Sequence, residues 1–598
     1  MPRSPSIALA LAILGGVLTA TVATAQPRTP PRFRPFNGVS ADQFYQSSVA
    51  RWADQLAHDL GVVKAELGAS RLPPPTRGAL IGHTDRTAAA AVGLATAARQ
   101  SPDRGRMYAA FAGVEAAFGE LNTLAVRTGN LGPAYARVVY DFQQLSVTIT
   151  DGDKNPDRAR RSVIRLAEGL DEQSDVLRSL ADEKLGPRFT RELDQEIQQF
   201  ARKAQKLHRD LNAKGDLALA GQALPSLGQT WGQVVTLIDR VPNVPPGVRG
   251  QAARVDALYR RLAERIAVVV PPPAPMPGVV VLPPPPMFRF SPSKAAVVAV
   301  AAGDGGGPRV EVYHDLRTRI PAFDFFAYDG GFRGGVRVSV ADVDGDGVPD
   351  IITAPGKGMP PLIRVFSGQD LSLLAEFYGA DPQWQGGVHI AASDLTADGR
   401  ALIAVAPDVG GGPQVRIFDL VQGREVTSFF AFPQQLRGGA RLAWADVNAD
   451  GQPDLVVAPG PCDHGPLVRV YNIADKKILT EFLAFAPTWK GGVWLASDRG
   501  IHILCGADAG GPPEVRVFKP TVQPQPAADW VAFPPLYRGG VRVAYADIDG
   551  DGLWDFICAP GGGLRDCPIR VFSGKDAREI LSLPAFPGFE GGAFVGGR

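Results

Sequence analysis

Six evenly spaced Gly-Gly pairs in the carboxyl-terminal half of this 598-residue chain mark a repeat of about 50 residues. The pairs begin at Gly334, Gly386, Gly438, Gly491, Gly539 and Gly591, at intervals of 52, 52, 53, 48 and 52 residues. In the first full unit we expect strands at Val336 to Val340, Asp350 to Ala354 and Ile363 to Phe366, and a fourth that ends in Phe377. Four short strands in about 50 residues are typical of a propeller blade, so the repeat predicts a β-propeller.

The two ends of the repeat region predict how the ring closes. Ala296 to Val300 matches the second strand of later units, and no first strand precedes it. After the last Gly-Gly pair, Ala593 to Arg598 matches a first strand alone. The two fragments add up to one blade. We therefore expect six blades, closed by pairing of the terminal strand with the opening one, which removes an exposed sheet edge.

An acidic loop lies between the first two predicted strands of three units. Its copies are Asp342-Val-Asp344-Gly-Asp346-Gly-Val348-Pro-Asp350, Asp446-Val-Asn448-Ala-Asp450-Gly-Gln452-Pro-Asp454 and Asp547-Ile-Asp549-Gly-Asp551-Gly-Leu553-Trp-Asp555. Side-chain oxygens at positions 1, 3, 5 and 9 and the backbone carbonyl of position 7 (Val348, Gln452, Leu553) are the ligands that Ca²⁺ prefers. An EF-hand would need a Glu at position 12 and a following helix, whereas these loops lead into strands. The sequence predicts three Ca²⁺ sites, with a metal-free Asp/Gly turn as the alternative.

The same units resemble the FG-GAP (VCBS-type) repeats of integrin-like propellers, and the resemblance covers residues 288–598. It rests on the Asp-x-Asp-x-Asp-Gly-x-x-Asp loop and on the Ala-Pro-Gly segments that begin at Ala354, Ala458 and Ala559. The resemblance implies calcium between the first two strands of a blade at the three intact copies. A fourth copy, Asp394 to Leu402, lacks the acid at position 9, and a fifth, Asp498 to His502, is shortened. The metal-binding pattern is incomplete in both.

An arginine recurs on the third predicted strand of five units, at Arg364, Arg416, Arg469, Arg516 and Arg570. We expect it to pair with an acidic or carbonyl group between blades, because guanidinium groups suit such contacts. A ring of ligand-binding arginines is the alternative.

The amino-terminal half is predicted to be all-helical. Between residues 40 and 269 apolar residues recur at helical spacing, with breaks at Pro or Gly, and indicate eight helices. The first and fifth helices are similar, as are the fourth and eighth. We therefore expect two tandem four-helix bundles, residues 40–150 and 151–269. The histidines His58, His83 and His208 lack the Glu-x-x-His spacing of di-metal bundles.

Three further segments frame these two halves. The apolar run Ile7 to Val22 and the following Ala-Thr-Ala predict an export signal over residues 1–25, with an uncleaved anchor as the alternative. Residues 26–39 are predicted to be a disordered leader. Residues 270–287 form a proline-rich linker, stiff enough to hold the halves up to about 50 Å apart. No later stretch is long enough to cross a bilayer. We expect an exported protein in the periplasm, on the cell surface or outside the cell, with no transmembrane segment after signal cleavage.

Charge and motifs narrow the function. A net charge of +1 offers no electrostatic basis for binding nucleic acid or anionic membranes. Four cysteines are too few for a disulfide scaffold, although Cys558 and Cys567 are close enough in sequence for one bridge. No catalytic motif is present. We expect a non-catalytic binding, scaffold or adhesion-type protein whose calcium-stabilised propeller presents a surface to a protein or glycan ligand. The alternative, a propeller-type polysaccharide lyase or hydrolase with a site in the central channel, rests on fold analogy.

Overall fold

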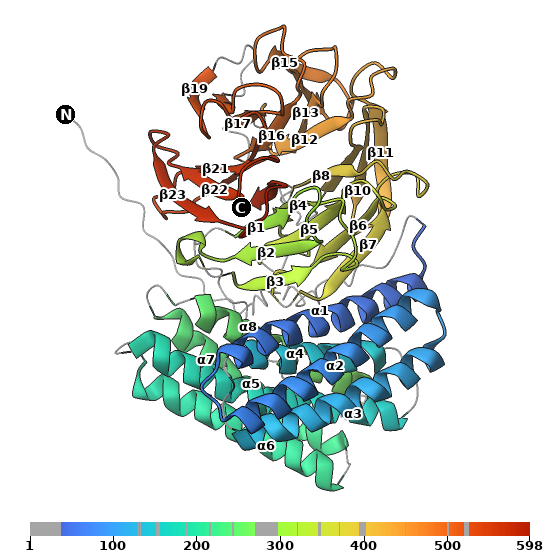
Figure 1. Ribbon diagram of the computed structural model, residues 1–598, viewed down its shortest axis with the longest axis vertical. Coiled ribbons are helices and arrows are strands. Elements are labelled where there is room, and N and C mark those ends of the chain that lie inside the picture. The colour runs from blue at the N-terminus through green and yellow to red at the C-terminus, as the bar shows by residue number, and fades with distance from the viewer. Residues whose placement is uncertain are drawn as a thin grey trace, which may run out of the picture.

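The computed structural model describes residues 38–598, apart from 129–130, 132, 151–155, 187–188, 215–216, 242–243, 245, 270–296, 320, 345–347, 370, 394–401, 449, 499–501 and 520–525. The predicted export signal, all but two residues of the predicted leader, and the predicted linker lie outside the described residues. The described part consists of a helical layer and a β-propeller that lies on it (Figure 1).

Eight α-helices form the described amino-terminal layer, as the hydrophobic spacing predicts. They are α1 (Ala41–Ala69), α2 (Pro74–Gln100), α3 (Arg104–Thr128), α4 (Pro133–Thr150), α5 (Pro156–Leu185), α6 (Arg191–Lys214), α7 (Leu217–Asp239) and α8 (Pro246–Val269). The first begins with a capping box, in which the Ser40 hydroxyl accepts from the Gln43 amide and the Gln43 side chain accepts from the Ser40 amide. Helix α1 packs on α2 and α4, α5 packs on α6 and α8, and α4 packs on α5. Buried residues of all eight helices, among them Trp52, Phe142 and Trp231, belong to one continuous hydrophobic core.

The carboxyl-terminal half is a six-bladed β-propeller, and each blade is a four-stranded antiparallel sheet. From the innermost strand outward, blade 1 contains β24 (Ala593–Gly597), β1 (Val298–Ala302), β2 (Arg309–Tyr313) and β3 (Phe323–Phe326). Blade 2 contains β4 (Val336–Ala341), β5 (Asp350–Pro355), β6 (Leu362–Phe366) and β7 (Leu373–Tyr378). Blade 3 contains β8 (Val388–Ser393), β9 (Leu402–Pro407), β10 (Gln414–Asp419) and β11 (Arg424–Phe430).

Blades 4 to 6 repeat this order. Blade 4 contains β12 (Ala440–Ala445), β13 (Asp454–Pro459), β14 (Leu467–Asn472) and β15 (Ile478–Leu483). Blade 5 contains β16 (Val493–Ser497), β17 (Ile503–Ala507), β18 (Glu514–Phe518) and β19 (Pro526–Val531). Blade 6 contains β20 (Val541–Ala546), β21 (Asp555–Pro560), β22 (Pro568–Phe572) and β23 (Glu579–Pro584). The first strand of each blade contacts the first strands of its two neighbours, so these six strands surround the centre of the ring.

The ring closes by its carboxyl-terminal strand. Strand β24 pairs antiparallel with β1, with Ala302 opposite Ala593 and Val298 opposite Gly597. Just beyond this pairing, Val297 and Arg598 exchange two backbone hydrogen bonds of 2.9 and 3.0 Å. The predictions of six blades and of closure by the terminal strand are confirmed.

The recurring third-strand arginine links neighbouring blades. In blade 2, Arg364 donates to Glu376 at 2.7 Å and to the carbonyl of Ala327, in the preceding blade, at 2.8 Å. The equivalent arginines Arg469, Arg516 and Arg570 donate to the carbonyls of Ala431, Ala484 and Ala532. Arg416 bonds the carboxylate of Glu425. The predicted partner between blades is therefore a carbonyl for four of the five arginines, whereas the acidic partners lie within the arginine's own blade.

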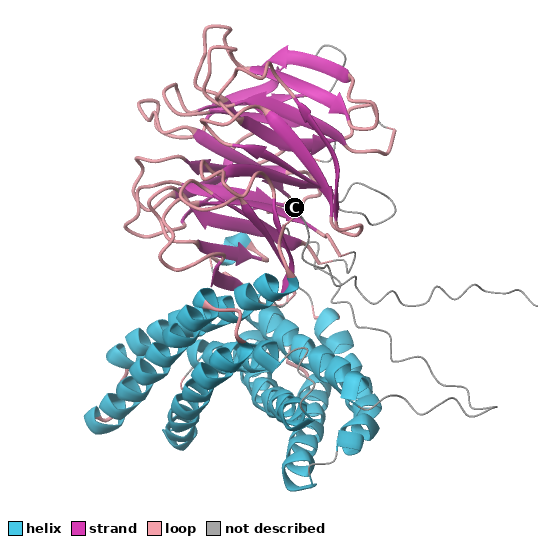
Figure 2. Cartoon of the chain, turned by 90° about the vertical axis from the view of Figure 1, so that its right-hand side faces the viewer, coloured by secondary structure: helices cyan, strands magenta, loops and turns pink. Residues whose placement is uncertain are grey.

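The two halves are in direct contact, within the upper limit of about 50 Å that the linker length allows. Helix α1 lies along β3, the outer strand of blade 1 (Figures 1 and 2). The Gln55 side chain donates to the Asp324 carbonyl at 3.0 Å and accepts from the Phe326 amide at 3.4 Å. These are backbone groups on the free edge of β3, which otherwise have no strand to pair with. The ring of His58 packs on Phe326, with centroids 4.7 Å apart. The linker length therefore did not predict the spacing of the halves.

The four cysteines are free, so the bridge considered between Cys558 and Cys567 is not formed. Cys505 in β17 and Cys558 in β21 are fully buried and occupy the repeat position of Val457 in β13. They fill ordinary core positions. Among the described helices, none combines the length and apolar character that a membrane span requires.

Candidate functional site

The three acidic loops occupy the same place in alternate blades. Asp342 follows β4, Asp446 follows β12 and Asp547 follows β20, and each loop ends where the second strand of its blade begins, at Asp350, Asp454 or Asp555. The loops therefore lie at one end of the inner strands of blades 2, 4 and 6, as the repeat register predicts.

In two of these loops the carboxylates converge. Oxygen atoms of Asp342, Asp344 and Asp350 all lie within 4.8 Å of one another, and so do oxygen atoms of Asp547, Asp549 and Asp551. Asp346 lies outside the described residues. In the middle loop, where position 3 is Asn448, the described carboxylates do not form such a group. The structure thus brings together six of the predicted ligands in two clusters.

The position-9 aspartates organise the loops from below. Asp350, Asp454 and Asp555 are fully buried, and each accepts a hydrogen bond from the amide of position 2, at 2.8, 3.1 and 2.8 Å respectively. In blades 2 and 6 the second carboxylate oxygen accepts from a glycine amide, Gly368 or Gly574. These bonds close the loop across its base, so position 9 shapes the loop that carries the exposed acids.

Asp454 differs in one respect. Its Oδ1 is buried and has no hydrogen-bond donor among the described residues. Burial raises the pKa of Asp454 to about 6, with the neighbouring Asp450 and Asp446 adding to the effect. A cation in this loop would pair with that oxygen and relieve the repulsion among the three acids.

In blades 4 and 6, short turns build the described upper part of the loop. In blade 6, Asp547 accepts from the amides of Gly550 at 2.8 Å and Gly552 at 3.1 Å, and Asp551 accepts from the amide of Leu553 at 2.8 Å. In blade 4, Asp446 accepts from Asp450 and Gly451, and Asp450 accepts from Gln452. The side-chain atoms that these loops offer as metal ligands are all oxygens, which suit a hard cation such as Ca²⁺ and not a soft one.

Of the two incomplete copies, the structure describes the ends of the one in blade 5. The copy at 394–402 falls almost entirely outside the described residues. In blade 5, the His502 ring nitrogen Nδ1 lies 2.7 Å from Asp498 Oδ2, and the His502 amide also donates to that carboxylate. The shortened loop is thus closed by its own side chains.

A second group of functional side chains was missed by the sequence analysis. The second residues of the six inner strands meet at the other end of the channel, and we call them the mouth ring: Arg337, His389, Arg441, Trp494, Arg542 and Phe594. In each blade this residue lies opposite a small residue of the second strand, namely Ala354, Ala406, Ala458, Gly506, Ala559 or Ala301. In the sequence, a large side chain stands three residues after the first glycine of each of the six Gly-Gly pairs that mark the repeat.

Ion pairs cross the mouth ring between blades. Asp408, which follows β9, lies 2.6 Å from Arg337, 3.2 Å from Arg441 and 3.0 Å from His389 Nε2. Asp508, which follows β17, lies 3.4 Å from Arg441. Burial opposes the charged form of Asp408, but His389 and Arg441 outweigh it and hold its pKa well below the usual value. Burial, assisted by the charge of Arg441, lowers the pKa of His389 to about 3, so its ring is neutral at pH 7.

The aromatic members of the ring pack against the guanidinium groups. Arg441 lies 4.3 Å from the centroid of Trp494, and Arg542 lies 3.6 Å from that of Phe594. Arg337 is 4.7 Å from the same Phe594 ring. Arginine and aromatic side chains of the ring therefore pack against one another at this end of the inner strands.

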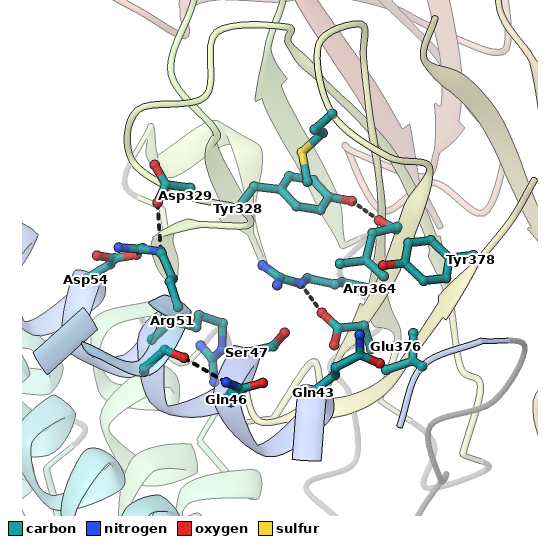
Figure 3. Close-up of a pocket in the computed structure, with 16 residues that line it drawn as sticks. Gln43, Gln46, Ser47, Arg51, Asp54, Tyr328, Asp329, Arg364, Glu376 and Tyr378 are labelled. Carbon is teal, nitrogen blue, oxygen red and sulfur yellow. Dashed lines mark hydrogen bonds and ion pairs between the residues drawn. The ribbon is translucent and has the colours of Figure 1, made fainter. Parts of the chain in front are cut away.

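A cavity of about 330 Å³ lies between α1 and blades 1 and 2 (Figure 3). Its polar lining is largely engaged within the protein. The Tyr328 hydroxyl donates to the Leu362 carbonyl at 2.8 Å, and Arg364 bonds Glu376. Arg99 of α2 pairs with both Asp54 of α1 and Asp329 of blade 1. Burial raises the pKa of Asp54 to about 6 against the opposing charge of Arg99. The cavity is thus lined by the contacts that hold the two halves together.

No protein-family model matches this chain, and no curated protein matches it either.

Proposed function

We propose that the protein is an exported, non-catalytic binding or scaffold protein, of adhesion type, whose β-propeller is stabilised by Ca²⁺ in loops of the FG-GAP kind. The observation that carries the proposal is the pair of carboxylate clusters at Asp342, Asp344 and Asp350 and at Asp547, Asp549 and Asp551, at the same place in two blades. Three carboxylates within 4.8 Å of one another repel, and a bound cation would remove that repulsion.

In this proposal the oxygen ligands are those at positions 1, 3, 5, 7 and 9 of the three loops. The buried Asp454 Oδ1 supports the middle loop as a site, although its described carboxylates do not converge. Each bound ion would join the first strand of a blade to the second, at the end of the inner strands opposite the mouth ring. Calcium would therefore stabilise three alternate blades.

The broader role rests on the arrangement of the surfaces. The helical layer is docked on blades 1 and 2 through α1, so the protein offers partners a propeller and a helical layer that are held together. The outer strands of blades 3 to 5 end in exposed apolar side chains, Phe430, Leu483 and Val531. Such residues are suited to contacts with a protein or glycan ligand. The export signal at residues 1–25 supports a location outside the cytoplasm, where free Ca²⁺ suffices for sites of this kind.

Calcium titration tests this proposal. We expect three bound ions by calorimetry, and a propeller that gains about 2.7 kcal/mol of stability for each bound ion when free Ca²⁺ is 100 times the Kd, because the ions bind only the folded loops. Asp551→Asn should reduce the stoichiometry to two. Asp475→Asn is the matched control, because Asp475 is an acid of the same propeller that pairs with Lys477 in a turn outside the loops.

A chain that binds no calcium, and whose melting temperature is the same with and without a chelator, would overturn the calcium part of the proposal. The binding role is tested separately, by screening the calcium-loaded protein against a glycan array and against plant and algal polysaccharides. Retention of a polysaccharide without cleavage supports a binding protein, and release of shorter products would replace it with the lyase or hydrolase alternative.

A further inference from the structure

Around the mouth ring, positive and negative side chains alternate from blade to blade. Arginines stand on the inner strands of blades 2, 4 and 6, at Arg337, Arg441 and Arg542. In the blades between them, the residue that follows the second strand is Asp408 in blade 3 and Asp508 in blade 5. Each acid lies between two arginine-bearing blades, and Asp408 pairs with both of its arginine neighbours.

The alternation is broken in blade 1. Ala302, Pro407 and Ala507 occupy the same register position, so the residue equivalent to Asp408 and Asp508 is Gly303. No side chain fits there, because a Cβ on Gly303 would come within 2.3 Å of the Gly591 carbonyl oxygen and 2.8 Å of that of Gly592. The chain therefore cannot supply a third acid at this position.

Arg542 and Arg337 lie on the two sides of blade 1, where the acid is missing, and its absence affects Arg542 more. It makes no ion pair with any described residue; its Nη1 donates to the Ala593 carbonyl at 3.0 Å, and its buried Nε has no acceptor in the described chain. Arg337 has Asp408 on one side, whereas toward the gap its nearest acid is Asp304, 3.7 Å away. The Asp304 side chain is 49% exposed, so it only partly replaces the missing acid.

The surroundings of Arg542 make an anion favourable. Burial and the positive charge of Arg337 lower the pKa of Arg542 to about 10, which means that its cation is held in an unfavourable place. The buried ring of Phe594 packs against it, with the ring centroid 3.6 Å from the guanidinium carbon. Guanidinium groups bind carboxylates through two parallel hydrogen bonds, and such charge-assisted bonds are strong where water is partly excluded.

We propose that the channel mouth binds a carboxylate ligand in place of the third acid, with Arg542 as its main contact and Arg337 beside it. The ligand is either a free organic acid or the carboxylate of a uronic acid residue in a glycan. The site lies at the opposite end of the inner strands from the acidic loops, so it does not depend on calcium binding there.

Binding is measured on the full chain by calorimetry and thermal shift, at a fixed calcium concentration and with ionic strength held constant by KCl. The probes are potassium acetate and potassium D-glucuronate, with D-glucose as the neutral control and potassium sulfate as a competing anion. We expect saturable binding of the carboxylates and none of glucose. Glucuronate binding at least about tenfold tighter than acetate identifies a uronic acid ligand, whereas equal affinities identify free organic acids.

Arg542→Gln should weaken carboxylate binding by about tenfold or more. Its matched control is Arg570→Gln, because Arg570 is an arginine of the same blade that already pairs with Glu579 and donates to the Ala532 carbonyl. Arg570→Gln should bind like the unchanged protein. Asp304→Asn is the second variant, and it keeps the test decisive if Arg542→Gln does not fold. Since Asp304 is half exposed and repels an incoming anion, its neutralisation should tighten binding several-fold.

Four results would overturn the proposal: no saturable carboxylate binding, unchanged affinity in Arg542→Gln, unchanged or weaker affinity in Asp304→Asn, or tighter binding of sulfate than of either carboxylate. Because calcium binding is measured independently, loss of this site with three calcium ions still bound separates its failure from that of the proposed function.

Discussion

Neutralising Asp408 should destabilise the propeller strongly. This carboxylate is shared by Arg337, His389 and Arg441, and the two arginines are 7% and 3% exposed. Asp408→Asn keeps the shape of the side chain, removes its charge and replaces one accepting oxygen with a donating amide group. Two buried guanidinium groups then lose their common counterion, and Arg337 keeps only the partly exposed Asp304 while Arg441 keeps Asp508.

The expected size follows from the cost of leaving a buried charge unpaired. Removing one partner of a buried ion pair costs about 3–5 kcal/mol. For a domain of this size roughly 2 °C of melting temperature corresponds to 1 kcal/mol, so Asp408→Asn should melt about 6–10 °C below the unchanged protein at pH 7. Differential scanning calorimetry, with near-ultraviolet circular dichroism as a second probe of the propeller, measures the shift.

Asp463→Asn is the control for this substitution. Asp463 also pairs with a cation, Lys490 at 2.7 Å, but its side chain is 88% exposed. Because solvent screens this pair, the control should melt with the unchanged protein. A melting temperature of Asp408→Asn within about 2 °C of that control would refute the reasoning that the mouth ring depends on paired buried charge.

Three further predictions concern the same architecture. Because His389 has a pKa of about 3 in the folded ring and about 6.5 when unfolded, the unfolded chain takes up a proton that the folded chain does not. The free energy of unfolding should therefore fall by up to about 1.4 kcal/mol per pH unit below pH 6.5. In urea unfolding at pH 7.5 and 5.5, His389→Gln should flatten this pH dependence, whereas an unchanged slope would exclude His389 as its source. Deleting residues 593–598 removes β24 and leaves β1 as an open sheet edge. We therefore expect either a large drop in melting temperature or self-association of the truncated chain on size-exclusion chromatography. A truncated chain that stays monomeric and melts at an unchanged temperature would contradict closure by β24. Gln55→Ala leaves the Asp324 carbonyl and the Phe326 amide without their partner, at a cost of about 1–3 kcal/mol for each group. Protease should therefore separate the two halves sooner than in the control Gln198→Ala, whose side chain bonds within α6. Equal cleavage rates in the two variants would count against Gln55 as the link.

Much of the fold follows from the sequence because its signals are local or repeated. The eight helices follow from hydrophobic spacing and from breaks at Pro or Gly. The register of the Gly-Gly pairs is the basis for the blades, and the split unit at the two ends predicts the pairing of β24 with β1. The same register predicts that Arg364 and its equivalents bond across blades, and four of the five do, because a residue at one repeat position meets a similar neighbour in successive blades.

The mouth ring and the docking of α1 were decided by the tertiary structure. The six ring positions carry Arg, His, Arg, Trp, Arg and Phe, so no single residue type repeats to mark them, and their side chains meet only after the sheet has closed into a ring. The gap at Gly303 likewise becomes visible only beside Arg542, more than two hundred residues away in the chain. Gln55 reaches β3 because the outer strand of a blade has unpaired backbone groups, and which helix satisfies them depends on how two separately folded surfaces fit. Local sequence sets periodicity, whereas contacts between distant segments depend on the closed three-dimensional ring.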